Sequence, residues 1–151
     1  METILIASDH AGFILKEKLK SYLTRIGLRV KDLGAYSKER CDYPDFACIL
    51  ASAISKNKHK RGVLICKSGI GNSIVANRFP RVRAALCYSV KAARLSREHN
   101  DSNVLVLGSA FVSEEYAKRI LKVWLNTGFL GGRHARRLKI IADIERRIKE
   151  Y

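Results

Sequence analysis

The chain has 151 residues, the usual size of one domain, and its 29 Lys and Arg against 14 Asp and Glu give a net charge of +15. No apolar stretch approaches the roughly 20 residues that span a bilayer, and the apolar run near Met1 is too short for a signal peptide. We therefore expect a soluble, cytoplasmic protein without membrane contacts, folded as a single domain over residues 1–151.

The excess of basic residues makes nucleic acid a partner to consider. The basic residues are scattered over many segments, and the sequence has no RNA-binding, helix-turn-helix or zinc-finger signature. We therefore expect no nucleic-acid partner, and we keep a polyanion binder without catalysis as an alternative. The same positive field would attract an anionic substrate.

In chain order, the first predicted strand is an apolar run over residues 4–8, followed by a helix over 13–26 that Gly27 closes. Residues 28–33 alternate between apolar and polar, as a half-exposed strand does. After a loop, Pro44 starts the next helix.

Residues 62–65 are apolar without alternation, which is typical of a strand buried on both faces of a parallel sheet. The predicted elements after it are a helix over 70–79, a strand over 82–87, a helix over 89–99, a strand over 103–108, and helices over 113–125 and 133–149. Five strands alternating with helices predict an α/β fold: a doubly wound, Rossmann-like five-stranded parallel sheet with helices on both faces and a C-terminal helix.

The segment from Cys66 to Ser73 joins a buried strand to a helix through a turn with two glycines, which let a ligand approach the backbone closely. The first amides of the helix point back at the turn and favour an anion there. A thiol in this position should have its pKa below the free value of about 8.5. Cys66 is therefore a candidate general base or nucleophile, and the alternative is an inert thiol at the end of a strand.

The other cysteines lack such a context. Cys48 and Cys87 fall in apolar patterns where we expect packing, and the set with Cys41 has no spacing typical of a zinc site or a disulfide framework. We expect four reduced thiols and no metal site.

Further polar clusters follow predicted strands at Asp9-His10 and at Gly108-Ser109. The carboxyl ends of parallel strands share one edge, so the Asp9 and Cys66 clusters can converge there. Asp9-His10 could instead be a helix N-cap followed by a surface histidine.

Two other groups allow two interpretations. His99-Asn100-Asp101 precedes the last strand and could equally be a favoured helix C-terminus. Arg133 and Arg137 lie one helical turn apart and could clamp a phosphate, or form a solvated basic face.

Five motifs occur along the chain in a characteristic order. They are Ile6-Ala7-Ser8-Asp9-His10-Ala11-Gly12-Phe13, Asp42-Tyr43-Pro44-Asp45, Cys66-x-Ser68-Gly69-x-Gly71-x-Ser73, Leu95-Ser96-Arg97-x-His99-Asn100-Asp101 and Gly131-Gly132-Arg133-His134-x-x-Arg137. Together they resemble the type B ribose-5-phosphate isomerases over essentially the whole chain. Galactose-6-phosphate isomerase subunits share this fold and much of the pattern.

The resemblance implies an aldose–ketose isomerase of the pentose phosphate pathway that interconverts D-ribose 5-phosphate and D-ribulose 5-phosphate through an enediolate, without a cofactor. It implies that Cys66 is the base, moving a proton between C1 and C2, and that His99 helps to open the sugar ring with Ser68 nearby. It also implies a homodimer or a dimer of dimers with shared active sites, in which His99 and Asn100 come from the neighbouring subunit.

The resemblance also assigns the substrate contacts. The backbone amides of the turn hold the enediolate oxygen with help from Asn100, while a histidine and two arginines grip the phosphate and two further side chains contact the sugar. The turn amides are those of Lys67, Gly69, Ile70 and Gly71. The phosphate contacts are His10, Arg133 and Arg137, and the sugar contacts are Asp9 and Tyr43.

The chain departs from the family at two positions. Lys67 stands where the family commonly has Gly, and a lysine would be strained if the backbone needs positive φ there. Ala110 stands where many relatives carry Arg, so one substrate contact is missing or comes from elsewhere.

Two rival enzymatic interpretations remain open. A galactose-6-phosphate isomerase would use the same residues on a six-carbon sugar. The segment from Cys66 to Ser73 is also similar to the loop of low-molecular-weight phosphotyrosine phosphatases, but that chemistry requires Arg where this chain has Asn72.

Overall fold

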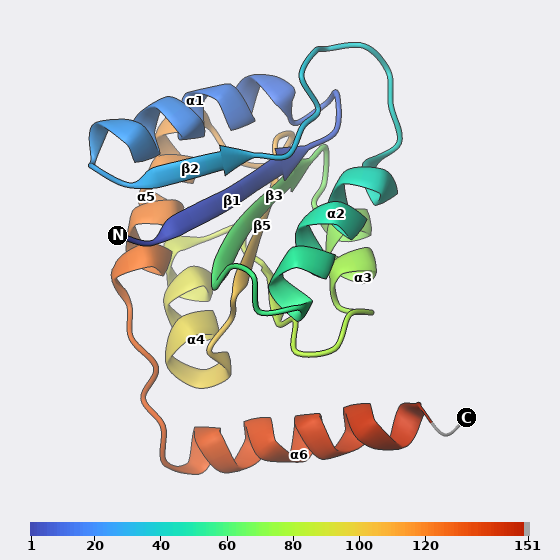
Figure 1. Cartoon of the computed structure of the whole chain (residues 1–151). Coiled ribbons are helices and arrows are strands. Elements are labelled where there is room, and N and C mark those ends of the chain that lie inside the picture. Colours follow the sequence, from blue (N-terminus) through green and yellow to red (C-terminus); the bar gives the residue numbers. More distant parts are fainter. Residues whose placement is uncertain (150–151) are drawn as a thin grey trace.

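The computed structural model of the chain describes residues 1–149, and its centre is a five-stranded parallel sheet (Figure 1). The strands lie in the order β2-β1-β3-β5-β4, with bounds β1 Thr3–Ser8, β2 Arg29–Asp32, β3 Arg61–Cys66, β4 Ala84–Leu86 and β5 Val104–Gly108. The helices are α1 Phe13–Arg25, α2 Tyr43–Ser55, α3 Ile70–Ala76, α4 Val90–Asn100, α5 Glu114–Asn126 and α6 Arg133–Ile148. The predicted doubly wound α/β fold is confirmed.

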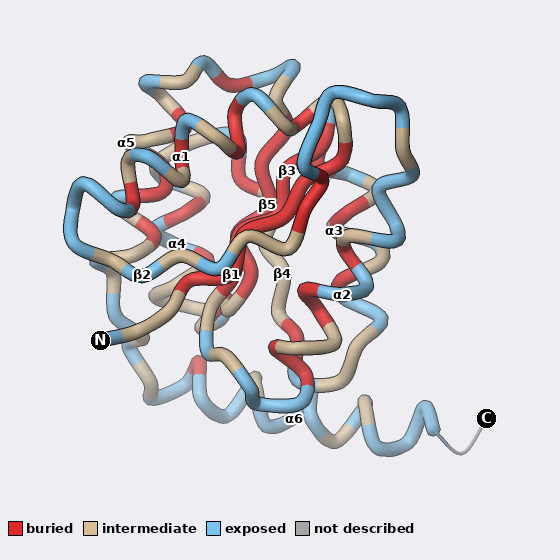
Figure 2. The backbone as a smooth tube through the Cα atoms, turned by 45° about the horizontal axis from the view of Figure 1, so that its top comes forward, coloured by how far each residue is buried: buried red, intermediate tan, exposed pale blue. Residues whose placement is uncertain are grey.

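Each face of the sheet carries its own apolar core. The helices α1, α4 and α5 pack on one face, where the ring of Trp124 is fully buried. The other face packs against α2 and α3, with Leu50 and Ile54 among the buried residues. The central strands are buried on both sides (Figure 2), which explains why β3 and β5 have no polar alternation.

Two predicted elements are shorter in the structure. The helix predicted over 70–79 ends at Ala76, where the side chain of Asn77 exchanges two hydrogen bonds with the backbone of Ala84 and turns the chain. The strand predicted over 82–87 is paired only over Ala84–Leu86, since the N–H of Arg83 donates to the side chain of Asn103 instead.

Cys48 does not pack as we expected, because it is exposed on α2. The buried face of α2 is formed by Ala47, Leu50, Ala51 and Ile54, which repeat at helical spacing. Position 48 lies outside that stripe. Cys87, by contrast, is buried in the core as predicted.

A fully buried lysine fixes the loop that leads from β2 to α2. The ammonium of Lys16 donates to Asp32 Oδ1 and to the carbonyl of Ala35, both at 2.6 Å. A second lysine, Lys20, binds the other oxygen of Asp32 at 2.6 Å. The paired charges offset the cost of burying the ammonium, and they hold the start of the loop that delivers Tyr43.

The last helix, α6, stands apart from the sheet at the end where the strands begin, and it is mostly exposed (Figures 1 and 2). Its isoleucines at 141, 144 and 148 are 46%, 42% and 61% exposed. None of the helices within residues 1–149 is both long and apolar enough to cross a membrane.

Candidate active site

Cys66 is the last residue of β3 and lies inside the turn that leads to α3. Its side chain is nearly buried, and the N–H of Gly69 donates to its sulfur at 3.2 Å. Gly69 has a φ of +83°, which an L side chain rarely adopts, and the Ser68 hydroxyl accepts from the N–H of Ile70 at 3.1 Å. The turn is therefore a cradle of backbone amides around a thiol.

The pKa of the Cys66 thiol is raised, whereas the sequence led us to expect a lowered value. Burial is the largest cause, because it disfavours the thiolate, and the carboxylate of Asp9 adds to it. The backbone amides of Asn72, Gly69 and Ser68 oppose the shift without cancelling it. The prediction from the helix N-terminus was wrong because α3 has only seven residues and the thiol is almost dry.

The Asp9-His10 cluster lies at the same edge of the sheet as Cys66. The N–H of Asp9 donates to the carbonyl of Ile65 at 3.4 Å, and its buried carboxylate accepts from the N–H of Gly12 at 3.0 Å. Nδ1 of His10 lies 3.2 Å from the backbone N of Cys41 and 3.1 Å from the carbonyl oxygen of the same residue, so the Cys41 backbone holds the ring in either tautomer. Asp9 therefore closes its own turn while lying close enough to influence the thiol.

Tyr43 and the turn after β5 complete this edge. The Tyr43 ring lies against Gly71, where an added Cβ would come within 2.4 Å of the ring. The amides of Ser109 and Ala110 donate to the carbonyls of Cys66 and Lys67, both at 2.9 Å. The structure thus brings together the segments predicted to follow β1, β3 and β5.

Lys67 fits its position without backbone strain. The non-glycine residues with positive φ in the described part of the chain are Asn57, Arg81 and Asp101. Lys67 is exposed, so a lysine replaces the family's glycine at the rim of the turn at no conformational cost.

The remaining predicted site residues lie at the opposite edge of the sheet. Asn100 ends α4, and its carbonyl accepts from Arg83, which precedes β4, at 3.0 Å. The arm that leads to α6 is tied to the same place, since the N–H of Leu130 donates to the carbonyl of Glu98 at 3.1 Å. Arg133 and Arg137, in the first turns of α6, therefore share the edge with His99 and Asn100 (Figure 1).

The rings of His99 and His134 stack at this edge, with centroids 4.2 Å apart and planes 11° from parallel. His134 is nearly buried, and its pKa is lowered by that burial, by His99 and by Arg133 and Arg137. The stack fixes the plane of the His99 ring. His134 belongs to the Gly131–Arg137 motif, so the sequence offered a signal for it, although we had given it no role.

One chain does not bring the two sets of residues together. The strand β3 has six residues that rise about 3.3 Å each, so the two edges of the sheet are about 16 Å apart. Cys66 lies at one edge, and His99, Asn100 and the two arginines lie at the other.

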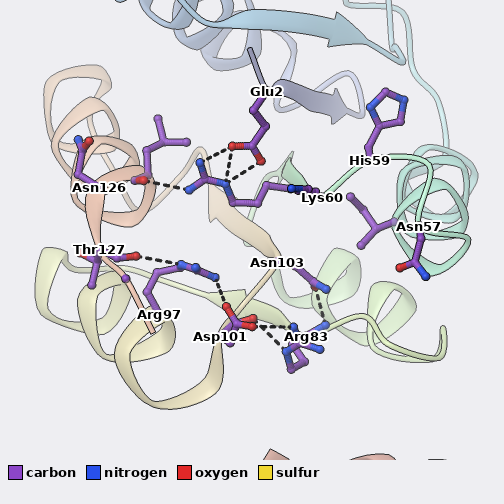
Figure 3. Close-up of a pocket in the computed structure, with 14 residues that line it drawn as sticks. Glu2, Asn57, His59, Lys60, Arg83, Arg97, Asp101, Asn103, Asn126 and Thr127 are labelled. Carbon is purple, nitrogen blue, oxygen red and sulfur yellow. Dashed lines mark hydrogen bonds and ion pairs between the residues drawn. The ribbon is translucent and has the colours of Figure 1, made fainter. Parts of the chain in front are cut away.

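A cavity of about 720 Å³ lies at the edge where the strands begin, and Figure 3 shows the side chains that line it; Cys66 is not among them. Its arginines are already paired: Arg61 with Glu2 at 2.6 Å, and Arg97 with Asp101 at 2.9 Å. We therefore do not assign this cavity to the substrate. Within residues 1–149, no three His, Cys, Asp or Glu side chains gather as metal ligands would.

The comparisons with known proteins agree with the sequence motifs and the fold. Residues 4–141 match the model of the ribose/galactose isomerase family. Ribose-5-phosphate isomerase B of Escherichia coli (strain K12) is 44% identical over 147 residues, which is 97% of this chain and 99% of the relative.

Solved structures give the same result. A ribose-5-phosphate isomerase B from Clostridium thermocellum superposes with a TM-score of 0.95 at 43% identity, over 97% of this chain and 99% of its own. The enzyme from Mycoplasma genitalium, solved with bound ribulose-5-phosphate, superposes with a TM-score of 0.91 at 41% identity, over 95% and 96%. The chain therefore belongs to the ribose/galactose isomerase family, as a ribose-5-phosphate isomerase B or a related sugar phosphate isomerase.

Proposed function

We propose that the protein interconverts D-ribose 5-phosphate and D-ribulose 5-phosphate through an enediolate, with Cys66 as the general base. The observation that carries the proposal is the position of Cys66 in an amide-lined turn at the carboxyl end of a central strand. The chain also matches, along nearly its full length, enzymes that bear the name of this activity.

The residues at the Cys66 edge suit the chemistry of the proton transfer. A thiolate takes the proton from one carbon and returns it to the next, and the enediolate oxygen gains negative charge in between. The backbone N–H groups of the turn from Lys67 to Gly71 are the donors that would stabilise such charge, and the N–H of Gly69 already donates to the sulfur. His10 grips the phosphate, while Asp9 and Tyr43 contact the sugar.

The rest of the site comes, in this proposal, from a second copy of the chain. The groups that we assign to ring opening, to the enediolate oxygen and to the phosphate are His99, Asn100, Arg133 and Arg137, and in their own chain they belong to the edge about 16 Å from the Cys66 edge. A two-fold dimer that sets the first edge of one chain against the second edge of its partner would form two complete sites.

Exposed apolar side chains support such a dimer. Ile49, Ile70 and Ile74 on α2 and α3 are 50%, 51% and 54% exposed, beside the Cys66 turn. At the other edge, α6 exposes Ile141 and Ile144 along a groove of about 440 Å³. Burying both patches in a reciprocal contact would remove apolar surface from water.

Arg137→Ala is expected to raise KM for the phosphorylated sugar by about 10- to 100-fold and to change kcat less, because a charge-assisted contact to the phosphate is lost. Steady-state kinetics measure the effect. Arg136→Ala, which removes the adjacent exposed arginine of α6, is the matched control and should behave like wild type. Equal losses in both variants would argue against a phosphate clamp at Arg137.

The pH dependence of kcat/KM is expected to follow the thiolate. Because burial raises the pKa of Cys66 above its ordinary value, the base is mostly protonated at neutral pH and the rate should rise with pH. The expected slope below the pKa is about tenfold per pH unit. Arg137→Ala should lower the curve without moving it along the pH axis. A flat or falling profile above neutral pH would contradict a thiolate base.

A coupled isomerase assay on the purified protein tests the proposed function directly. Ribose 5-phosphate should be turned over with the higher kcat/KM, and galactose 6-phosphate is the substrate to compare. The family's name covers both sugars, so the second candidate is a galactose-6-phosphate isomerase subunit. Turnover of the six-carbon phosphate alone would replace the first proposal with the second.

A further inference from the structure

Asn72 is a polar residue in an apolar place. It is 1% exposed, in the first turns of α3, and neither its Nδ2 nor its Oδ1 has a hydrogen-bond partner among the described residues. A buried amide without partners costs free energy, whereas an apolar side chain of the same size would not. A structural role alone therefore gives no reason for an asparagine here.

The position of Asn72 relative to Cys66 suggests what the amide does. The backbone N–H of Gly69 donates to the Cys66 sulfur at 3.2 Å, and the backbone of Asn72 is a second group that lowers the pKa of the thiol. Along α3, Asn72 shares its buried face with Ala76, which packs on the sheet face that carries Leu64. Side chains alternate along β3, so Cys66 projects to the same face as Leu64, which is the face on which α3 packs.

We propose that Asn72 is a positioning residue for the base: when Cys66 loses its proton, the Asn72 side chain turns and donates an N–H to the thiolate. The protonated thiol has little need of a further donor, which fits an amide that is unpartnered in the resting state. The thiolate forms in a nearly dry site, where each donor is worth more than in water. The inference rests on the proposed function of Cys66 and adds a residue to it.

Other groups near the Cys66 thiol would also affect its ionisation. Asp9, from the turn after β1, opposes the thiolate. Lys67 is the neighbouring residue of the turn, and Tyr43, from α2, lies on Gly71. None of these is altered by replacing the Asn72 amide, so a shift in the thiol's titration on that replacement reports on Asn72.

The test is Asn72→Leu, which removes the amide and keeps the volume, with Ser8→Ala as the matched control. Ser8 is also fully buried, and its hydroxyl also lacks a partner within residues 1–149, but β1 alternation places it with Ile4 and Ile6 on the opposite sheet face. Both variants should raise Tm, because each removes a buried group without partners.

Only Asn72→Leu should change the chemistry. In the pH profile of kcat/KM, the rise with pH is expected to shift to higher pH by about one unit in this variant. The value of kcat/KM should then be about tenfold lower at pH 7, and the plateau at high pH should be unchanged. The proposal is overturned if the pH profile of kcat/KM does not shift in Asn72→Leu, or if it shifts equally in Ser8→Ala. Asn72→Met, with a more flexible side chain, gives the same readout if the leucine variant does not fold.

A direct titration separates this inference from the proposed function. In a Cys41→Ser/Cys48→Ser background, which leaves the buried Cys87 and Cys66, the rate of alkylation of Cys66 by iodoacetamide reports its pKa. Asn72→Leu should shift that pKa upward even if the protein turned over no sugar phosphate. Identical titration curves with and without the amide would refute the link between Asn72 and the thiolate.

Discussion

Replacing Cys66 by Ser is expected to lower kcat for ribose 5-phosphate by about 10³-fold or more, because general base catalysis contributes roughly 10²- to 10⁴-fold and a hydroxyl is a far poorer base than a thiolate. The substitution is small and keeps the side chain in its turn, where the N–H of Gly69 can still donate to it. Circular dichroism and Tm should therefore change little. The affinity for the substrate, measured by calorimetry, should also stay within a few-fold of wild type.

Two controls make the result specific to Cys66. Cys48→Ser changes an exposed thiol on α2 and should leave kcat unaltered. Cys87→Ser changes a buried thiol, whose pKa burial raises to about 11, and should alter stability more than turnover. Turnover near the wild-type value in Cys66→Ser would remove this residue from the base role and leave it as a packing thiol.

Two inactive variants are expected to restore each other when their chains are combined. Cys66→Ser disables one edge of the chain, and His99→Ala disables the other. In a mixed dimer one site would contain both defects and the other neither. Random pairing makes half of the dimers mixed, so the combined sample should recover about one quarter of the wild-type activity.

The experiment uses two differently tagged chains that are expressed together, followed by purification through both tags. Dimers selected in this way each hold one intact site and should show about half of the wild-type activity. The matched control combines Cys66→Ser with Cys66→Ala, two defects at the same edge, which should restore nothing. Failure of the first pair in doubly tagged dimers would exclude a site shared between chains.

Most of the fold was predictable from local patterns. The buried runs at β1, β3 and β5 gave clear signals, since a strand buried on both faces is apolar over several adjacent residues. The predicted bounds were wrong where residues distant in the sequence determine the end of a helix or strand. The end of α3 depends on contacts of Asn77 with β4, and the span of β4 depends on Asn103.

The sequence named the candidate site residues, and the structure adds their positions and surroundings. The sequence placed Cys66 after a strand and His99 before one, and the structure shows that they lie at opposite edges of the sheet. The raised pKa of Cys66 depends on burial by residues far away in the sequence, and the helix rule alone gave the wrong direction. The unpartnered amide of Asn72 had no signal at all, because an Asn on a helix is ordinary until its surroundings are known.

Cys66 and His99 lie at opposite edges of one chain, so a site that contains both would link the binding of the sugar to the pairing of chains. If both chains contact the same substrate molecule, bound substrate stabilises the dimer. By linkage, the factor by which dimerisation increases the affinity for substrate equals the factor by which substrate increases the affinity between the chains. Dilution would then inactivate the free protein sooner than the saturated one. The supply of sugar phosphate would set how much of the protein is assembled, so the pool of substrate would govern the amount of working enzyme as well as its rate.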